Sequence, residues 1–274
     1  MDATRKEDLA RQLVGYLVEE ARAHGRGVPG DIARLAADPR AGFDRLWPAF
    51  RALVNVRPPW PAQPSFLVAQ DELLPALIEE AGVSTVADAE PSPLDGRVRL
   101  WRGDITTFAC DAIVNAANAQ MTGCWQPLHY CIDNAIHTFA GVQLRAETAA
   151  LMAAQGHDEP TGHAKVTGAY NLPAKHVIHT VGPIAAGRPT AEHRRQLARC
   201  YEACLDAAAA RDCLSLAACC VSTGVFGFPQ DEAARIAVAT VRGWYADHPD
   251  SALITVFDVY GDGDEALYRD LLGL

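Results

Sequence analysis

Two thiols and one imidazole lie within eight residues, in the segment Cys124-Trp-Gln-Pro-Leu-His129-Tyr-Cys131. Zinc accepts thiolate and imidazole ligands together, and a proline between the ligands would stiffen the loop. Only three ligands are present locally, and a catalytic zinc keeps its fourth position for water or substrate. The spacing differs from that of zinc deaminases, which need a glutamate two residues after the histidine and a Pro-Cys-x-x-Cys partner. The segment is a candidate zinc site, catalytic or structural, although such a cluster also arises by chance in a chain with eight cysteines.

Amide and carboxylate side chains flank this segment on both sides. Asn115-Ala-Ala-Asn118 precedes it, and the small residues between the two amides would let a ligand approach the backbone; a strand-terminating turn is the simpler interpretation. Asp133 follows it and could be a general base or a ribose-binding carboxylate. Local sequence favours a helix N-cap for Asp133, because it precedes an apolar-periodic run. His137, four residues later, is more typical of a packed core histidine than of a ligand.

Two other segments have residues suited to a nucleotide. Ser222-Thr-Gly-Val-Phe-Gly-Phe-Pro229 lies between an apolar strand and a helix, and its glycines would expose successive amides to a diphosphate. The segment lacks the lysine of a Walker loop, so this signal is weak when taken alone. Gly103-Asp104-Ile105-Thr106 places a carboxylate at a strand end. There it would accept a hydrogen bond from an adenine amino group, or cap the following turn.

Alternating strands and helices must position these segments from residue 96 onward. Short apolar runs predict strands at 98–101, 112–115, 176–180, 215–220 and 253–259, and helices are expected at 134–155, 192–211, 230–247 and 265–272. This alternation predicts an α/β sandwich with a largely buried, partly parallel sheet. Ligands of such sheets bind beyond the carboxyl ends of the strands, where the segments described above occur.

The first 95 residues have a helical pattern instead. Leu9, Leu13, Tyr16 and Leu17 fall on one helical face, which favours a core-facing helix over a membrane-surface helix. Several prolines between 58 and 64 interrupt regular structure, a further helix is expected at 70–81, and Pro91-Ser92-Pro93 marks a boundary. We expect a helical extension at 1–95, packed on a main domain at 96–274.

The composition of the chain limits the kinds of molecule that it is expected to bind and the cellular compartment in which it is expected to occur. The net charge of -10 argues against a surface that follows nucleic-acid phosphates, but a small nucleotide bound by backbone amides needs no positive net charge. No apolar run is long enough to cross a bilayer, and the charged amino terminus is unlike a signal peptide. Disulfides are not needed at this length, and most of the cysteines lie among aliphatic residues. The expected location is the cytoplasm.

The order of these motifs resembles that of the macrodomain family. The resemblance covers about residues 97–272 and also includes Pro160-Thr-Gly-His-Ala and Val177-Ile-His-Thr-Val-Gly-Pro183. Common macrodomains have a glycine-rich loop where this chain has residues 123–131. That replacement resembles the zinc-containing branch of microbial macrodomains, and the segment Asn55-Val-Arg-Pro-Pro59 is similar to the amino-terminal extension of that branch.

The resemblance implies a fold and a set of site residues. The fold would be a three-layer α/β/α macrodomain with a mixed central sheet and an N-terminal helical extension. Asp104 and the Ile105 amide would bind adenine, Tyr260 would stack on it, Asn118 would orient the distal ribose, and Asp133 would lie beside the reactive face of that ribose. The amides of Ser222, Thr223, Gly224, Val225 and Phe226 would bind the diphosphate. Cys124, His129 and Cys131 would hold zinc close to the distal ribose.

The resemblance further implies an enzyme that binds ADP-ribose. The expected activity is zinc-dependent removal of mono-ADP-ribose from modified proteins, with a lipoyl carrier protein as one plausible substrate. Two alternatives use the same pocket: a non-catalytic reader of ADP-ribose and a deacetylase of O-acetyl-ADP-ribose. Release of free ADP-ribose from a modified protein would separate the hydrolase from the reader.

Overall fold

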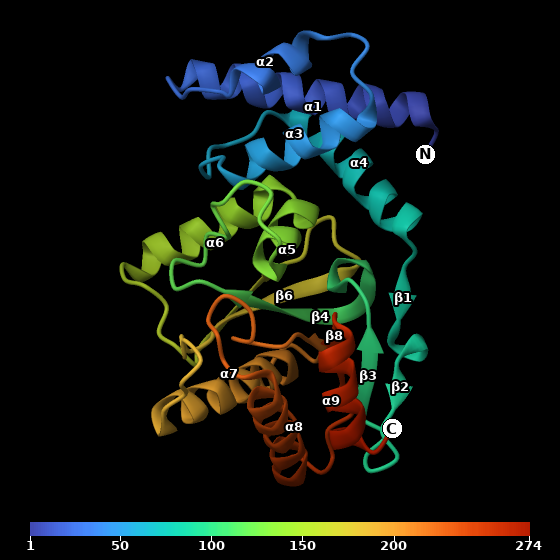
Figure 1. The fold of residues 1–274 in the computed structure, drawn as a ribbon, viewed down its shortest axis with the longest axis vertical. Coiled ribbons are helices and arrows are strands. Elements are labelled where there is room, and N and C mark those ends of the chain that lie inside the picture. Colours follow the sequence, from blue (N-terminus) through green and yellow to red (C-terminus); the bar gives the residue numbers. More distant parts are fainter.

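A mixed sheet of eight strands forms the centre of the structure, a computed structural model that describes residues 1–274 (Figure 1). The strands run in the order β2-β3-β8-β7-β4-β6-β5, and β1 pairs with the start of β4. All pairings are parallel except β2 with β3 and β5 with β6. Their bounds are Ser84–Thr85 (β1), Glu90–Pro91 (β2), Val98–Arg102 (β3), Phe108–Ala117 (β4), Ala164–Gly168 (β5), Ala174–Val181 (β6), Ser215–Ala218 (β7) and Ile254–Val259 (β8). The antiparallel edges make the sheet mixed, as predicted.

Helices cover both faces of this sheet. Helices α5 (Ile132–Ala140) and α6 (Val142–Gln155) lie on one face. Helices α7 (Ala191–Ala209), α8 (Gln230–Asp247) and α9 (Asp262–Leu272) lie on the other (Figure 1). The central strands are buried from both sides, which explains why they read as continuous apolar runs rather than as alternating ones. The predicted three-layer α/β/α sandwich is therefore confirmed.

Four helices precede the sheet and stack on the α5–α6 layer (Figure 1). They are α1 (Ala3–Ala23), α2 (Gly30–Ala37), α3 (Phe43–Asn55) and α4 (Pro64–Ala81). The predicted stripe of α1 is buried in a hydrophobic cluster of 17 residues that contains only residues of these helices and the turns between them. A separate cluster of 43 residues forms the core around the sheet. We propose that these helices form an extension with its own core, packed on the sheet-containing domain.

The structure differs from the sequence expectations in two places that matter here. The helix predicted at 134–155 is two helices, because the backbone of Gly141 has a φ of 99° and so leaves the helical conformation. Glycine suits this position also because a Cβ there would collide with the Gln70 side chain. The sheet also begins earlier than expected, since β1 and β2 lie within the segment predicted as helical extension. Two-residue strands without an apolar run leave no period to detect.

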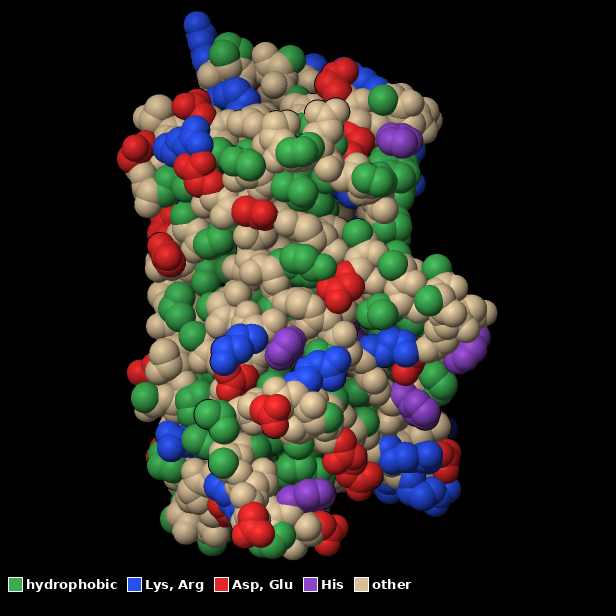
Figure 2. All heavy atoms as spheres, turned by 180° about the vertical axis from the view of Figure 1, so that it is seen from behind, with side chains coloured by type: hydrophobic (Ala, Val, Ile, Leu, Met, Phe, Trp, Pro, Cys, Tyr) green, Lys and Arg blue, Asp and Glu red, His purple; other side chains and the backbone are tan.

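The surface carries charges of both signs. On the face turned away in Figure 1, acidic and basic side chains are intermixed among apolar ones (Figure 2). Exposed ion pairs of the chain include Arg195 with Glu192 and Arg235 with Asp231. No helix combines the length and apolar composition needed to span a bilayer.

Candidate active site

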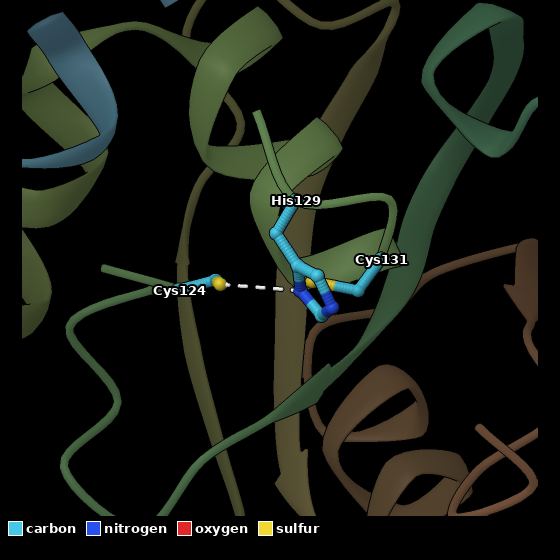
Figure 3. Close-up of side chains that lie close together, drawn as sticks. All are labelled: Cys124, His129 and Cys131. Atoms are coloured by element: carbon cyan, nitrogen blue, oxygen red, sulfur yellow. Dashed lines mark hydrogen bonds between the residues drawn. The ribbon is translucent and has the colours of Figure 1, made fainter. Parts of the chain in front are cut away.

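The three predicted zinc ligands converge in the loop between β4 and α5. We call residues 121–131 the metal loop. The Sγ atoms of Cys124 and Cys131 and a ring nitrogen of His129 all lie within 4.8 Å of one another, and Cys124 Sγ is 3.5 Å from His129 Nδ1 (Figure 3). Ligand atoms of a tetrahedral zinc site are roughly 3.5 Å apart, given bond lengths of about 2.0–2.3 Å. Two sulfurs and one nitrogen at this separation fit a zinc ion with one open coordination position.

The surroundings of Cys131 affect its protonation. All three side chains are half-buried. Burial raises the pKa of the Cys131 thiol to about 12, and the neighbouring Cys124 acts in the same direction. A thiolate is the form that binds metal, and a cation beside it stabilises that form.

Asp133 lies in the first turn of α5, two residues after Cys131. The prediction that Asp133 is the helix N-cap is wrong: Cys131 occupies the N-cap position, and no side chain caps this helix end. The carboxylate turns toward the sheet instead, where its Oδ1 accepts a hydrogen bond of 2.8 Å from Asn115 Nδ2. Burial raises the pKa of Asp133 to about 6, although the bond from Asn115 acts in the opposite direction. Asp133 is therefore a buried, oriented carboxyl group.

Two histidines lie close to Asp133 and to its hydrogen-bond partner Asn115. His137 Nε2 is 3.6 Å from Asp133 Oδ1, and His179 Nδ1 is 3.0 Å from Asn115 Nδ2. Burial lowers the pKa of His179 to about 3 and that of His137 well below its usual value. Both rings are therefore neutral, so the close approach of His137 to Asp133 is not an ion pair. The interpretation of His137 as a core histidine is confirmed.

Asn118 connects the end of β4 to the metal loop. Its Nδ2 donates to the carbonyl oxygen of Gly123 over 2.9 Å, while its buried Oδ1 has no partner in the chain. Gly123 has a φ of 80°, and a Cβ there would lie 2.8 Å from the His137 ring, so only glycine fits without a shift. The Oδ1 of Asn118 is therefore a hydrogen-bond acceptor without a partner in the chain.

The loop after β7 presents a row of unpaired amides. None of the backbone N–H groups of residues 222–226 donates a hydrogen bond within the chain. Ser222 adopts a φ of 68°, and the lack of a side chain at Gly182 leaves room for its Oγ. Successive free amides in a concave turn form an anion-binding nest. The segment predicted to bind the diphosphate therefore has five backbone amides without a partner in the chain.

Asp104 and Tyr260 follow neighbouring strands. Strands β3 and β8 are paired in parallel up to Arg102 and Val259, so the residues after them lie at the same sheet edge. Asp104 Oδ1 accepts from the amide and the hydroxyl of Thr106, which confirms the capping alternative but leaves Oδ2 free. Ile105 is buried beside it, and Tyr260 is 71% exposed. An exposed ring at this edge is free to stack on a planar ligand.

Two residues that contact the metal loop were not predicted from the sequence. Asn55, at the end of α3, accepts a hydrogen bond from the Leu128 amide. Arg145, in α6, donates to the carbonyl groups of Thr122 and Cys124. Asn55 occurs in a segment quoted above only for its resemblance. The only feature of the sequence that could have indicated a buried role for Arg145 is its position next to Leu144, an apolar residue of the same helix.

Strand polarity brings all of these segments to one side of the molecule. The segments follow β3, β4, β7 and β8, which are parallel, so they lie beyond the same carboxyl edge of the sheet. The protein is thus a three-layer α/β/α sandwich whose candidate ligand-binding segments and Cys-His-Cys group lie at the carboxyl edge of the sheet, the edge at which such folds bind ligands. Solved structures with this fold include the Trypanosoma brucei macrodomain in complex with ADP-ribose, at 29% identity and a TM-score of 0.63, covering 81% of this chain and 95% of that chain. The Oceanobacillus iheyensis macrodomain with MES bound is similar at 30% identity and a TM-score of 0.59, covering 64% and 90%.

Sequence comparison agrees with the structural comparison. Residues 114–237 match the Macro domain family. A Treponema medium protein named protein-ADP-ribose hydrolase is 49% identical over 263 residues, which are 95% of this chain and 96% of that protein. A Staphylococcus aureus protein of the same name is 46% identical over 231 residues, 84% of this chain and 86% of that protein. The chain belongs to the macrodomain family, and it is a hydrolase, as the sequence predicted.

Proposed function

We propose that this hydrolase acts on mono-ADP-ribosylated proteins, releases ADP-ribose and depends on zinc. The observation that carries the proposal is the convergence of Cys124, His129 and Cys131 beside the free acceptor of Asn118 and the buried carboxyl group of Asp133. The names of the similar Treponema medium and Staphylococcus aureus proteins support ADP-ribose as the group removed. They also favour an enzyme over a reader that binds without cleavage.

The sheet edge has groups for each part of ADP-ribose. The free Oδ2 of Asp104 would accept from the adenine amino group, the Ile105 amide would donate to the ring, and Tyr260 would stack on it. The five amides of residues 222–226 would bind the diphosphate. The distal ribose would then reach Asn118 and the metal loop, which follow the neighbouring strand β4.

Hydrolysis at the anomeric carbon needs an activated water and stabilisation of developing charge. A zinc ion held by Cys124, His129 and Cys131 would supply a Lewis acid that polarises a ribose oxygen or lowers the pKa of water. Asn118 would orient the ribose through Oδ1. Asp133, fixed by Asn115, would accept the proton of the attacking water. Phe226, half-buried beside the diphosphate loop, would help to exclude bulk water.

A direct assay tests the activity. Purified protein is incubated with a mono-ADP-ribosylated protein, and free ADP-ribose is quantified by chromatography together with loss of the modification. We expect stoichiometric release that stops after chelation and resumes with added zinc. Tight binding of ADP-ribose without release would contradict the hydrolase assignment for this substrate. A lipoyl carrier protein as the natural substrate stays a prediction, as does the cytoplasmic location.

Replacing Asp104 with alanine is expected to weaken ADP-ribose binding about 10- to 100-fold. A hydrogen bond to a charged group contributes about 1.5–3 kcal/mol, and the turn would also lose its cap at Thr106. Calorimetric titration with ADP-ribose measures the change. Ribose 5-phosphate, which lacks adenine, should bind the variant and the parent protein equally. An equal loss for both ligands would instead indicate a general distortion of the site.

A further inference from the structure

The metal loop makes few hydrogen bonds of its own. Between Cys124 and Cys131 the only backbone bond within the loop runs from the His129 amide to the Gln126 carbonyl group, at 3.3 Å. Met121 and Leu128 both have positive φ values, 56° and 57°, which side chains larger than glycine rarely adopt. Such conformations persist only where the surrounding structure imposes them. Contacts from outside the loop must therefore fix the ligand positions.

One of these outside contacts comes from the N-terminal extension. Asn55, at the end of α3, is buried, and its Oδ1 accepts from the Leu128 amide over 3.0 Å. Its Nδ2 donates to Thr138 Oγ1 of α5 over 3.1 Å. One amide side chain of the extension thus contacts both Leu128, the residue directly before the ligand His129, and α5, the helix whose N-cap is the ligand Cys131.

A second contact joins the extension to the other end of the metal loop. The buried guanidinium of Arg145 donates through Nη1 to the carbonyl groups of Val54 (2.9 Å) and Arg57 (2.8 Å) in the extension. Its Nε donates to Thr122 O over 2.7 Å, and its Nη2 reaches Cys124 O at 3.4 Å. The planar fork of arginine makes such a multiple contact rigid.

We infer that the N-terminal extension is part of the metal site, with Asn55 and Arg145 as positioning residues. Asn55 fixes the backbone before His129, and Arg145 fixes the backbone at Cys124, each by bonds that join the extension or α6 to the metal loop. The inference rests on the proposed zinc site. It assigns the extension a role in zinc affinity, in addition to any contribution to stability. Contacts that orient metal ligands typically contribute 10- to 100-fold to metal affinity.

Gln70 provides a matched control within the same interface. It is a buried amide of α4, its Oε1 accepts from the Val142 amide over 3.0 Å, and its Nε2 donates to Gln143. Gln70 therefore joins the extension to the junction of α5 and α6, whereas Asn55 joins the extension to the metal loop. Gln70 forms no hydrogen bond with a residue of the metal loop. Replacing either amide removes one polar bridge between the extension and the sheet-containing domain.

The experiment compares Asn55→Ala with Gln70→Ala in the full chain, with zinc as the probe. Zinc dissociation constants are measured by competition with a chromophoric chelator, and thermal unfolding is followed by circular dichroism. We expect Asn55→Ala to weaken zinc binding at least about 10-fold, and Gln70→Ala to leave it unchanged, with similar losses of melting temperature. Equal zinc affinities for the two variants and the parent would overturn the inference while leaving the proposed function intact. A parent protein that binds no zinc would overturn both.

Arg145→Lys gives a second test that does not depend on the folding of Asn55→Ala. Lysine keeps the charge but cannot contact four carbonyl groups in one plane. With Co²⁺ in place of zinc, we expect weaker metal binding and altered visible absorption bands, because these bands report the arrangement of the ligands. Bands and affinity identical to those of the parent would show that Arg145 does not position the ligands.

Discussion

Replacing Cys131 with serine is expected to lower kcat at least about 10³-fold. A serine hydroxyl stays protonated at neutral pH and is a poor ligand for zinc, so the site would keep only Cys124 and His129. The charge stabilisation lost with the metal is several kcal/mol, and each 1.36 kcal/mol corresponds to a factor of about ten in rate. Release of ADP-ribose from a modified protein measures the effect, and zinc content is determined on the same preparation.

Cys110→Ser is the matched control for this variant. Cys110 is also half-buried and lies near the start of β4, away from the carboxyl end that leads to the metal loop. The control should keep its zinc and its turnover. Both variants should still bind ADP-ribose through the adenine and diphosphate contacts. Full turnover by Cys131→Ser would refute a role for zinc in the reaction.

Replacing Asp133 with asparagine is expected to reduce kcat about 10²- to 10⁴-fold, the usual contribution of a general base. Asparagine has the same shape and keeps an oxygen that can accept the bond from Asn115, but it cannot take a proton from water. Zinc content and ADP-ribose affinity should stay close to those of the parent, because Asp133 is not one of the three grouped ligands. Single-turnover kinetics with saturating enzyme isolate this step.

Asp206→Asn controls for the same chemical change elsewhere. Asp206 lies on α7, across the sheet from α5, and its Oδ1 accepts from Trp244 Nε1 over 2.8 Å. This control should leave kcat unchanged. If Asp133→Asn kept kcat within a factor of about ten of the parent, another group would have to activate the water.

Most of the sheet-containing domain could be predicted from the sequence because its strands are continuous apolar runs separated by helical periods. Helix α8 was predicted with the bounds that the structure has, Gln230–Asp247. The grouping of Cys124, His129 and Cys131 was also predictable, because ligands within eight residues are close in any compact loop. The carboxyl-edge position of the amide-rich loop followed from the general behaviour of parallel sheets.

Contacts between residues distant in sequence were beyond this reasoning. Local sequence favoured an N-cap for Asp133, whereas the structure shows a bond to Asn115 on a strand 18 residues earlier. Asn55 meets Leu128 across 73 residues, and Arg145 meets Val54 across 91. Neither residue type nor periodicity encodes such pairs. They arise only when the extension packs on α5 and α6, so tertiary packing decides which polar side chains support the site.

X-ray absorption at the zinc edge of the purified protein tests the central claim most directly. We predict one zinc per chain, with two sulfur ligands at about 2.3 Å and the remaining nitrogen or oxygen ligands at about 2.0–2.1 Å, from Cys124, Cys131, His129 and one exchangeable group. In Cys131→Ser, one sulfur should disappear from the spectrum or the zinc should be lost. A zinc coordinated without sulfur, or a fully active protein that contains no metal, would contradict the account.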